Sequence, residues 1–280
     1  MQICRTVAEL RAARARFGAL GFAPTMGYLH EGHLGLARRA KAECGASLVS
    51  IFVNPTQFGA GEDLERYPRD ETRDLALLAE EQTDLVFLPH VSDIYPEGFA
   101  STVDPGPLAH VLEGASRPGH FVGVATVVAK LLNMAQPTKA YFGQKDAQQC
   151  LVIRRVARDL DLPVEIVIHP TARDGDGLAL SSRNAYLSKA ERAAAPVLFR
   201  ALQAVQVRVA EGERDTDRLR QMMQATITAE PLAELDYVSL ADAETLGELE
   251  RLDRPALASV AVRFGATRLI DNLVLQPSAA

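Results

Sequence analysis

The sequence predicts an α/β fold: a Rossmann-like parallel sheet with helices on both faces, followed by a smaller C-terminal α+β domain. Up to about residue 175, short apolar segments rich in β-branched residues alternate with segments of helical period, as in a parallel sheet covered on both faces. After Tyr186, two helical stretches come first and the strand-like segments follow together. We therefore expect a first domain over residues 1–178 and a second over 179–280, with a mobile loop at the boundary.

The strands expected in the first domain are short apolar runs that end near turn signals. They are ALGFAP (19–24), SLVSIFV (47–53), DLVFLP (84–89), KAYFG (139–143) and VEIVIHP (164–170). The second run leads into Asn54-Pro55, a dipeptide that marks a turn. This pattern indicates strands whose two faces are both buried.

Helical spacing of apolar residues predicts the remaining elements. In the first domain these helices cover 5–17, 34–44, 69–82, 124–136 and 148–160. The first of them resembles the start of a transit peptide, but Glu9 and the lack of serine favour a helix of the domain itself. The second domain is expected to contain helices over 190–211 and 215–229 and strands over 236–240, 256–262 and 267–275, with a hairpin turn at 263–266.

Composition is that of an ordinary globular protein: 280 residues, 48% apolar and 24% charged. The formal net charge is −6 and the charges are mixed along the chain, which argues against a nucleic-acid partner. The longest apolar runs, such as 48–53, are too short to cross a membrane. Cys4, Cys44 and Cys150 lack zinc-type spacing, so we expect reduced thiols in a cytoplasmic protein.

The segment PTMGYLHEGH (24–33) lies between the first expected strand and the helix that follows it. A helix that begins at the carboxyl end of a strand offers free N–H groups to phosphate, and Gly27 and Gly32 permit a tight turn there. His30 and His33 are three residues apart and share one helical face. We interpret them as hydrogen-bond donors to a triphosphate rather than as surface histidines beside a helix cap.

Gln57 follows the strand expected over 47–53 and lies within SIFVNPTQFGAGEDLERYPRD (50–70). An amide offers one acceptor and two donors, which suits a small ligand with hydroxyl and carboxylate groups. The alternative is a glutamine that faces solvent in a loop. Its place, just past a strand's carboxyl end, favours substrate binding.

The segment YFGQKDAQQ (141–149) again ends a strand and opens a helix. Lys145 can meet a phosphate, Asp146 can accept from ribose hydroxyls, and Gln149 can turn toward the strand ends. The alternative is a capped helix start with a solvated lysine.

A fourth segment, RDGDGLALSSRNAYLS (173–188), contains Ser181, Ser182 and Arg183 at the expected domain boundary. Two hydroxyls and a guanidinium on a mobile loop can close over a leaving pyrophosphate and exclude water. The alternative is a plain interdomain linker, since serine, asparagine and glycine favour turns.

The H-x-G-H pattern resembles the HIGH signature of a nucleotidyltransferase superfamily, which implies that ATP is split between its α- and β-phosphates. Taken together, the blocks resemble the pantothenate synthetase family in order and spacing. They are PTMG-x-LHEGH, SIFVNPTQF, YPR, LEGASRPGHFVGV-TVV-KL, FGQKD-QQ and DGLALSSRN-YL. The resemblance runs from roughly residue 20 to 190, and RLIDN (268–272) extends it further; Tyr28 and GAGED (59–63) look like ordinary variation.

The resemblance implies that ATP drives the ligation of (R)-pantoate to β-alanine through a pantoyl-adenylate, with Mg²⁺ present and AMP and pyrophosphate released. It implies a catalytic set of His33 as general acid with His30, Lys145 and Arg183 stabilising charge. It implies pantoate contacts from Gln57 and Gln149, and a homodimer.

The ATP site that the resemblance implies is larger. It comprises Met26, Gly27, Tyr28, Leu29, His30, Glu31, Gly32, His33, Gly143, Gln144, Lys145, Asp146, Ala172, Leu180, Ser181, Ser182 and Arg183. Asp74 aligns with a carboxylate near the metal and phosphates, and His120 belongs to a family block in which it can equally hold a loop in place.

Two alternatives remain at this point. Another nucleotidyltransferase of the same superfamily would keep H-x-G-H but would leave Gln57, Gln149 and FGQKD unexplained. A catalytically inactive nucleotide-binding regulator would be expected to have lost His33, Lys145 or the SSRN loop, and all of these are present.

Overall fold

The computed structural model describes residues 1–277, and contacts within the chain divide it into two compact units. The first unit contains residues 1–144 and 148–170, and the second contains residues 145–147 and the chain from Thr171 onward. The expectation of a domain boundary after residue 178 stays a prediction. Among the described residues, no helix is both long and apolar enough to cross a membrane.

The first unit is built on a six-stranded sheet in the order β1-β4-β3-β2-β5-β6, and every pairing in it is parallel. The strands are β1 (Gln2–Cys4), β2 (Gly21–Thr25), β3 (Ser47–Ile51), β4 (Leu85–Phe87), β5 (Lys139–Gly143) and β6 (Glu165–His169). The chain runs outward from β2 to β3 and β4 and then returns to β5 on the other side of β2. The strand order therefore reverses between β2 and β5, where open α/β sheets bind their ligands.

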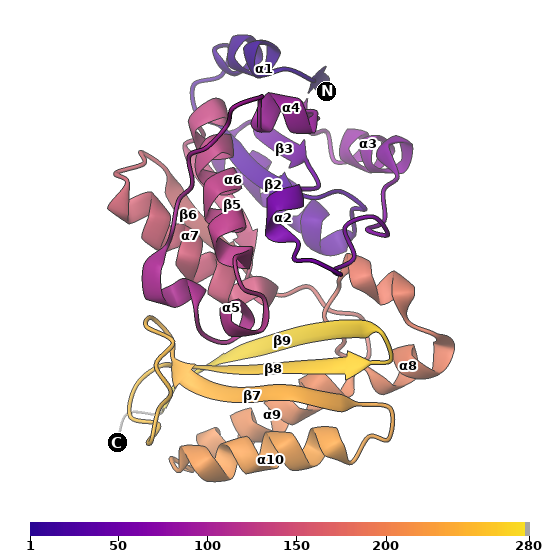
Figure 1. The fold of residues 1–280 in the computed structure, drawn as a ribbon, viewed down its shortest axis with the longest axis vertical. Coiled ribbons are helices and arrows are strands. Elements are labelled where there is room, and N and C mark those ends of the chain that lie inside the picture. Colours follow the sequence, from indigo (N-terminus) through magenta and orange to yellow (C-terminus); the bar gives the residue numbers. More distant parts are fainter. Residues whose placement is uncertain (278–280) are drawn as a thin grey trace. The chain divides into compact units, whose positions relative to one another are not determined.

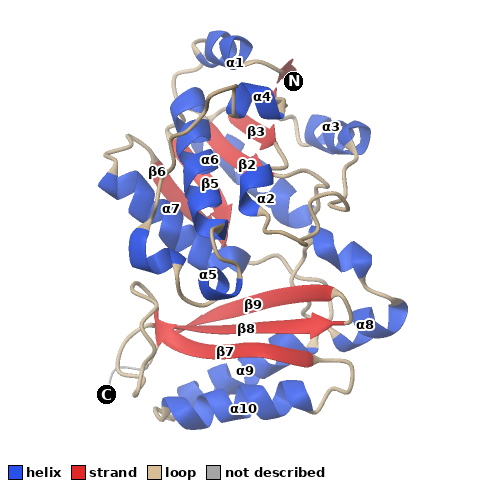
Figure 2. Ribbon diagram, in the orientation of Figure 1, coloured by secondary structure: helices blue, strands red, loops and turns tan. Residues whose placement is uncertain are grey.

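Seven α-helices accompany this sheet in the described part of the first unit (Figures 1 and 2). They are α1 (Val7–Arg14), α2 (Glu31–Cys44), α3 (Glu71–Glu80), α4 (Val91–Ile94), α5 (Glu113–Ser116), α6 (His120–Ala135) and α7 (Ala147–Asp159). Shorter 3₁₀ turns are η1 (Pro55–Gln57), η2 (Gly106–Ala109) and η3 (Gln144–Asp146). A capping box between Thr6 and Glu9 explains why α1 begins where it does.

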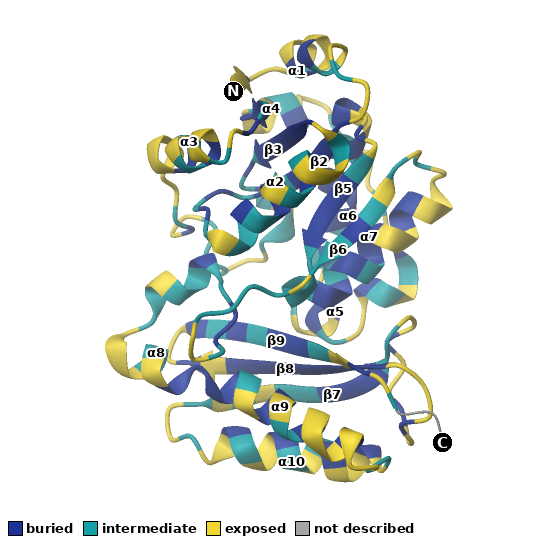
Figure 3. Ribbon diagram, turned by 180° about the vertical axis from the view of Figure 1, so that it is seen from behind, coloured by how far each residue is buried: buried dark blue, intermediate teal, exposed yellow. Residues whose placement is uncertain are grey.

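Both faces of the parallel sheet are covered, as the apolar strand sequences predicted. On one face, side chains of α1, α6 and α7 such as Leu10 and Ile153 pack against Phe22. On the other, α2 and α3 bury Ala37 and Leu78. Figure 3 shows the sheet strands as mostly buried and the outer helices as buried along one side only. The sheet thus holds its strand ends in fixed positions for the loops that follow them.

The second unit contains an antiparallel sheet in the order β7-β8-β9, with α9 and α10 packed on one face (Figure 1). Its elements are η4 (Ser182–Tyr186), α8 (Lys189–Ala194), α9 (Val197–Ala210), α10 (Thr216–Thr228), β7 (Glu234–Asp242), β8 (Ala256–Phe264) and β9 (Thr267–Leu275). The expected hairpin joins β8 and β9, and Gly265 there adopts a φ of 55°.

One prediction for this unit was wrong. The stretch 190–211 is not a single helix but two, α8 and α9, separated at Ala195 and Pro196. Proline has no N–H to donate to the preceding turn, so a new helix begins after it with Pro196 as its N-cap. The fold class itself, a parallel α/β sheet with a smaller α+β part, is confirmed.

Candidate active site

Three of the four predicted segments follow the carboxyl ends of three neighbouring strands. Residues 26–33 follow β2, residues 54–57 follow β3, and residues 144–149 follow β5, and β2 pairs with both other strands. This placement is at the strand-order reversal, the edge where a ligand is expected. The segments come from three different parts of the sequence, and the sheet alone brings them to one edge.

His30 and His33 form a stacked pair at the start of α2. Their ring centroids are 4.0 Å apart with an angle of 27° between the planes. His30 is the N-cap, and its Nδ1 accepts the N–H of Gly32 at 3.2 Å. The Nδ1 of His33 accepts the N–H of His30 at 3.4 Å. Because both Nδ1 atoms are acceptors, each neutral ring carries its proton on Nε2, which gives the helix start two side-chain N–H donors.

The loop that leads to these histidines is held by a buried carboxylate. Asp74, in α3, is 1% exposed, and its two oxygens accept the N–H groups of Tyr28 at 2.6 Å and Leu29 at 2.8 Å. Gly27 and Tyr28 have φ values of 82° and 49°, a left-handed pair that turns successive N–H groups toward one anion. Burial raises the pKa of Asp74, and the two backbone donors oppose that rise.

Asp74 therefore has a structural partner for each of its oxygens, where the resemblance implied a metal ligand. No group of three or more histidine, cysteine, aspartate or glutamate side chains that could hold a metal ion occurs among residues 1–277. The assignment of Asp74 to a metal stays a prediction without support from its contacts.

Gln57 lies at the end of η1 with its side-chain amide already oriented. Asn54, 1% exposed, donates from Nδ2 to Gln57 Oε1 at 3.1 Å, and Tyr95 donates its hydroxyl to Asn54 Oδ1 at 2.8 Å. On its other side Gln57 donates from Nε2 to the sulfur of Met26 at 3.1 Å. These bonds connect the loops after β2 and β3, so the predicted pantoate residue is fixed relative to the loop that contains the histidines.

The backbone of Gln57 is held by a polar cluster that sequence reasoning had only partly found. His120 Nδ1 donates to the Gln57 carbonyl at 2.8 Å, and Arg117 donates to the same oxygen at 3.3 Å. Arg117 also binds both oxygens of Glu62, at 2.8 and 2.6 Å. Burial, followed by the positive charge of Arg117, lowers the pKa of His120 to about 4, so the imidazole is neutral. His120 thus holds a loop, one of the two roles considered for it.

Glu62 and Arg117 were missed. Glu62 lies in GAGED (59–63), which looked like ordinary variation, and Arg117 lies in a family block to which no contact had been assigned. Their two blocks both flank Gln57 in the fold, and the opposite charges of Glu62 and Arg117 are the signal that could have indicated an ion pair there. Sequence separation of 55 residues hides that pairing.

Helix α6 packs closely against η1, the turn that ends at Gln57, and Gly123 lies at the point of contact. A Cβ atom placed on Gly123 would lie 2.3 Å from the carbonyl oxygen of Thr56. The Gly123 carbonyl also accepts from Asn54 at 3.3 Å. Only glycine allows this approach of a helix to the turn.

The segment after β5 contains a glutamine with structural contacts and residues predicted to bind substrates. Gln148, 5% exposed, is structural: its amide donates to the carbonyls of Leu108 and Val111, both at 2.8 Å. Gln149, the predicted pantoate residue, is partly exposed in the first turn of α7. Lys145 lies in η3 with its Nζ 3.4 Å from Asp146 Oδ1.

Within the second unit, the segment from Ala172 to Arg183 is tied by its own hydrogen bonds. Leu180 donates its N–H to the Ala172 carbonyl at 2.9 Å, and Ser181 caps η4 by accepting the N–H of Arg183 at 3.3 Å. Ser182 is 7% exposed. The expectation that this segment moves stays a prediction.

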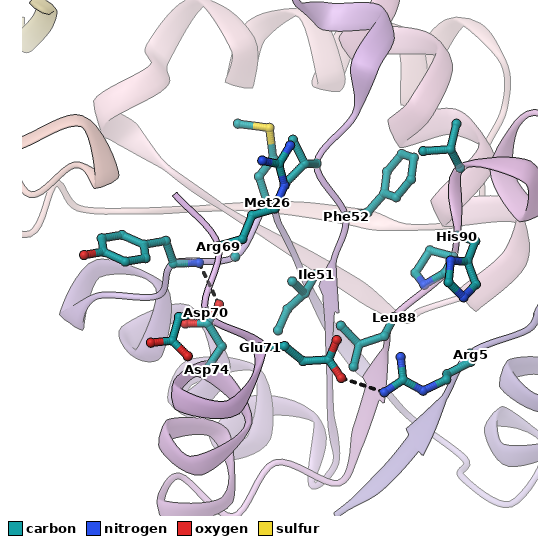
Figure 4. Close-up of a pocket in the computed structure, with 15 residues that line it drawn as sticks. Arg5, Met26, Ile51, Phe52, Arg69, Asp70, Glu71, Asp74, Leu88 and His90 are labelled. Carbon is teal, nitrogen blue, oxygen red and sulfur yellow. Dashed lines mark hydrogen bonds and ion pairs between the residues drawn. The ribbon is translucent and has the colours of Figure 1, made fainter. Parts of the chain in front are cut away.

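A cavity of about 360 Å³ opens beside the loops that follow β2, β3 and β4 (Figure 4). Of the predicted site residues, Met26, Gly27, Tyr28 and Asp74 line it. The remaining wall combines apolar side chains with Arg69, Asp70, His90 and an ion pair of 2.6 Å between Arg5 and Glu71. His30, His33, Gln57 and Gln149 are not part of its lining, so the cavity borders the loop of the predicted ATP segment and not the histidine pair.

Comparison with known proteins gives concordant results. A family model described as pantoate-beta-alanine ligase matches residues 2–274. A pantothenate synthetase from Roseiflexus castenholzii is 63% identical over 277 residues, covering 99% of this chain and 100% of the relative. One from Chloroflexus aurantiacus is 60% identical over 277 residues, covering 99% of each.

Two solved structures resemble this chain over nearly its whole length. A pantothenate synthetase from Thermus thermophilus superposes with a TM-score of 0.95 at 52% identity, covering 99% of this chain and 100% of that one. A pantoate-beta-alanine ligase from Francisella tularensis, complexed with beta-gamma ATP and beta-alanine, gives 0.81 at 34% identity, with 98% and 97% covered.

Proposed function

The chain belongs to the pantoate-beta-alanine ligase family, and on that premise we propose how its residues carry out the family's reaction. The reaction is the ATP-dependent ligation of (R)-pantoate and β-alanine to pantothenate through a pantoyl-adenylate, with release of AMP and pyrophosphate. The observation that carries it is the family match over residues 2–274. Neither alternative, a different nucleotidyltransferase or an inactive regulator, is favoured.

In the first step a carboxylate oxygen of pantoate attacks the α-phosphorus of ATP, and the bond from that phosphorus to the bridging oxygen breaks. Pyrophosphate leaves with the electron pair. In the second step the amine of β-alanine attacks the acyl carbon, AMP leaves, and the amine loses a proton. No protein nucleophile is needed, so the residues act by positioning the reactants and stabilising charge.

For His30 and His33 we propose direct contact with the phosphates. Their stacked rings and Nε2–H tautomers support this, because each ring can donate to a phosphoryl oxygen at the N-terminus of α2. His33, the predicted general acid, would donate to the oxygen on which charge accumulates as pyrophosphate departs. The rest of Met26–His33 is proposed to contact ATP through the same turn.

For Gln57 and Gln149 we propose contacts to pantoate. What supports Gln57 is the network of Asn54, Met26 and His120, which fixes its amide and its backbone before any ligand arrives. Pre-ordered polar groups lose less entropy on binding. Gln149 is supported by its place in the first turn after β5.

For the remaining predicted residues the roles implied by the resemblance are retained as proposals. Gly143 to Asp146 would contact ATP, with Lys145 placing positive charge near its phosphates. In the second unit, Ala172 would contact the nucleotide through its backbone, and Leu180 to Arg183 would contact the phosphates, with Arg183 stabilising the transition state.

Mg²⁺ is proposed to enter as the complex with ATP. Magnesium keeps several waters and binds mainly through substrate phosphates in such sites, which agrees with the lack of a three-ligand cluster in the described residues. A homodimer and a cytoplasmic location are also proposed, and analytical ultracentrifugation tests the first of these directly.

The experiment that tests the function mixes purified protein with Mg-ATP, pantoate and β-alanine and measures AMP and pantothenate by mass spectrometry. Equal amounts of both are expected. Without β-alanine, pyrophosphate and bound pantoyl-adenylate are expected, and His33→Ala should slow the formation of both by about 10²–10³-fold. A protein that binds ATP but releases no pyrophosphate with pantoate would refute the substrate assignment.

A further inference from the structure

Strand β9 contains two adjacent buried polar residues that the reaction scheme does not use. Asp271 and Asn272, within the RLIDN block, are 3% and 4% exposed. Neighbours along a strand point to opposite faces of the sheet, so the two side chains have different surroundings. Buried polar groups need partners, and the partners of these two are Lys145, which is proposed to bind ATP, and Arg173, which directly follows Ala172.

Asn272 holds the backbone of Lys145. Its Nδ2 donates to the Lys145 carbonyl at 2.7 Å, and both residues belong to the second unit. Lys145 lies in η3, a three-residue turn between β5 and α7. A hydrogen bond to the carbonyl fixes the peptide from which the lysine side chain extends.

Asp271 holds Arg173 through two hydrogen bonds. The guanidinium Nη1 and Nη2 donate to the carboxylate at 2.6 and 2.9 Å, and the Asp271 side chain is 2% exposed. The guanidinium lies 3.9 Å from the ring centroid of Phe199 and donates to the Gly177 carbonyl at 3.0 Å. Arg173 is therefore fixed on several sides.

Arg173 begins the turn that leads to the predicted phosphate loop. Asp174 donates its N–H to the Leu178 carbonyl at 2.9 Å, and Leu180 closes the turn on Ala172 at 2.9 Å. Arg173 and Ala179 form a β-bridge. A shift of Arg173 would thus move the backbone on either side of it, including Ala172 and the residues after Ala179.

We propose that Asp271 and Asn272 are positioning residues for ATP, Asn272 through the backbone of Lys145 and Asp271 through Arg173 and the turn from Ala172 to Leu180. The proposal rests on the ATP roles proposed above for Lys145 and for the segment 180–183. Replacing a buried ion pair by apolar residues is often neutral or stabilising, so the pair can be removed as a unit to test its role.

The first test compares Asn272→Ala and Asn272→Asp with Val260→Ala. Val260 is fully buried in β8, where it pairs with Asp271, and its apolar side chain cannot form a hydrogen bond with the segments proposed to bind ATP. The Asn272 variants should lower kcat/KM for ATP by roughly 10- to 100-fold, the scale of a small misplacement of a catalytic group, while the KM for pantoate is unchanged. Val260→Ala should lower Tm and leave the KM for ATP as in the wild type.

The second test removes the ion pair as a unit, with Arg173→Met and Asp271→Leu together, so that no buried charge is left alone. We expect a folded protein by circular dichroism, with a Tm below that of the wild type because the Asn272 N–H and the Gly177 carbonyl lose a partner. Its Kd for ATP, measured by calorimetry without pantoate at a temperature at which it is folded, should be weakened about tenfold or more. Wild-type ATP affinity in this folded double variant would overturn the role of Asp271. Equal losses of ATP efficiency in Val260→Ala and Asn272→Ala would overturn the role of Asn272.

These outcomes are separate from a failure of the proposed function. If the wild type forms no AMP from ATP and pantoate, the proposed function fails, whatever the variants do. If the wild type is active and the variants bind ATP equally well, only the positioning role fails.

Discussion

The carboxylate of Asp74 accepts the backbone N–H of Leu29 at 2.8 Å, so a residue of α3 holds the loop that opens α2. The second oxygen accepts from Tyr28 at 2.6 Å. The two donors are 46 and 45 residues away in sequence. This contact orders the approach to the histidine pair and gives the buried acid a role that needs no metal.

Asp74→Asn should lower kcat/KM by about 10- to 100-fold, because an amide can accept only one of the two N–H groups and the loop shifts. Leaving a buried N–H unpaired should also cost about 1–3 kcal/mol in the free energy of unfolding. The dependence of rate on Mg²⁺ concentration should be unchanged. Asp70→Asn, at the N-cap of the same helix, is the control and should leave the rate and stability close to those of the wild type, because asparagine caps a helix about as well as aspartate. A large rise in the Mg²⁺ requirement of Asp74→Asn would instead restore the metal assignment.

His30→Ala and His33→Ala should each lower kcat by about 10²–10³, the usual cost of one donor to a developing charge. The measurement is pyrophosphate release with saturating Mg-ATP and pantoate. Exposed His110→Ala is the matched control and should keep the wild-type rate. A loss confined to the KM for pantoate would contradict a role at the phosphates.

His120 should make stability depend on pH. Its pKa in the folded protein is about 4 against 6.5 in the unfolded chain, so between these values the unfolded state binds more protons. Stability contributed by this group is therefore full above pH 6.5 and falls as the pH drops toward 4, by about 3 kcal/mol at most. Urea denaturation at several pH values measures the slope.

His120→Asn keeps a donor for the Gln57 carbonyl but cannot titrate, so the slope between pH 4 and 6.5 should flatten. His110→Asn should leave the slope unchanged, since that residue is exposed. An unchanged slope in His120→Asn would mean that other groups cause the acid sensitivity.

Gly123→Ala should raise the KM for pantoate, because the new methyl group would lie 2.3 Å from the Thr56 carbonyl and push the Gln57 turn away from α6. Overpacking of this kind also costs about 1–3 kcal/mol. Gly18→Ala, with no heavy atom within 4 Å of the new Cβ, is the control. Steady-state kinetics with varied pantoate measures the effect, and a wild-type KM in a folded Gly123→Ala protein would contradict it.

The sequence patterns predicted the sheet well because buried parallel strands are continuous apolar runs. Strands β2 to β6 all lie within or close to the expected segments, but β1 was not expected, since the three residues Gln2–Cys4 are too few to show a period. The break between α8 and α9 could have been predicted from Pro196, whose effect was outweighed by the helical spacing on either side of it.

For the site, the sequence predicted the segments but not what holds them. Strands β3, β2 and β5 are neighbours in the sheet, so their carboxyl ends lie at one edge. This strand order places the segments that contain His30, Gln57 and Lys145 directly after those ends. The contacts of Asp74 and Glu62 were not predicted, because they join residues far apart in sequence and depend on the packing of helices and loops.

The dependence of Lys145 on Asn272 has a consequence for how the protein is made. A ribosome synthesises every residue proposed to bind ATP before it reaches β9, so a growing chain contains all of them while the carbonyl of Lys145 still lacks its partner. The enzyme should therefore reach full activity only once translation has passed residue 272 and β9 has joined its sheet. A nascent chain stalled earlier would contain every residue proposed to bind ATP but would lack the contact that positions Lys145.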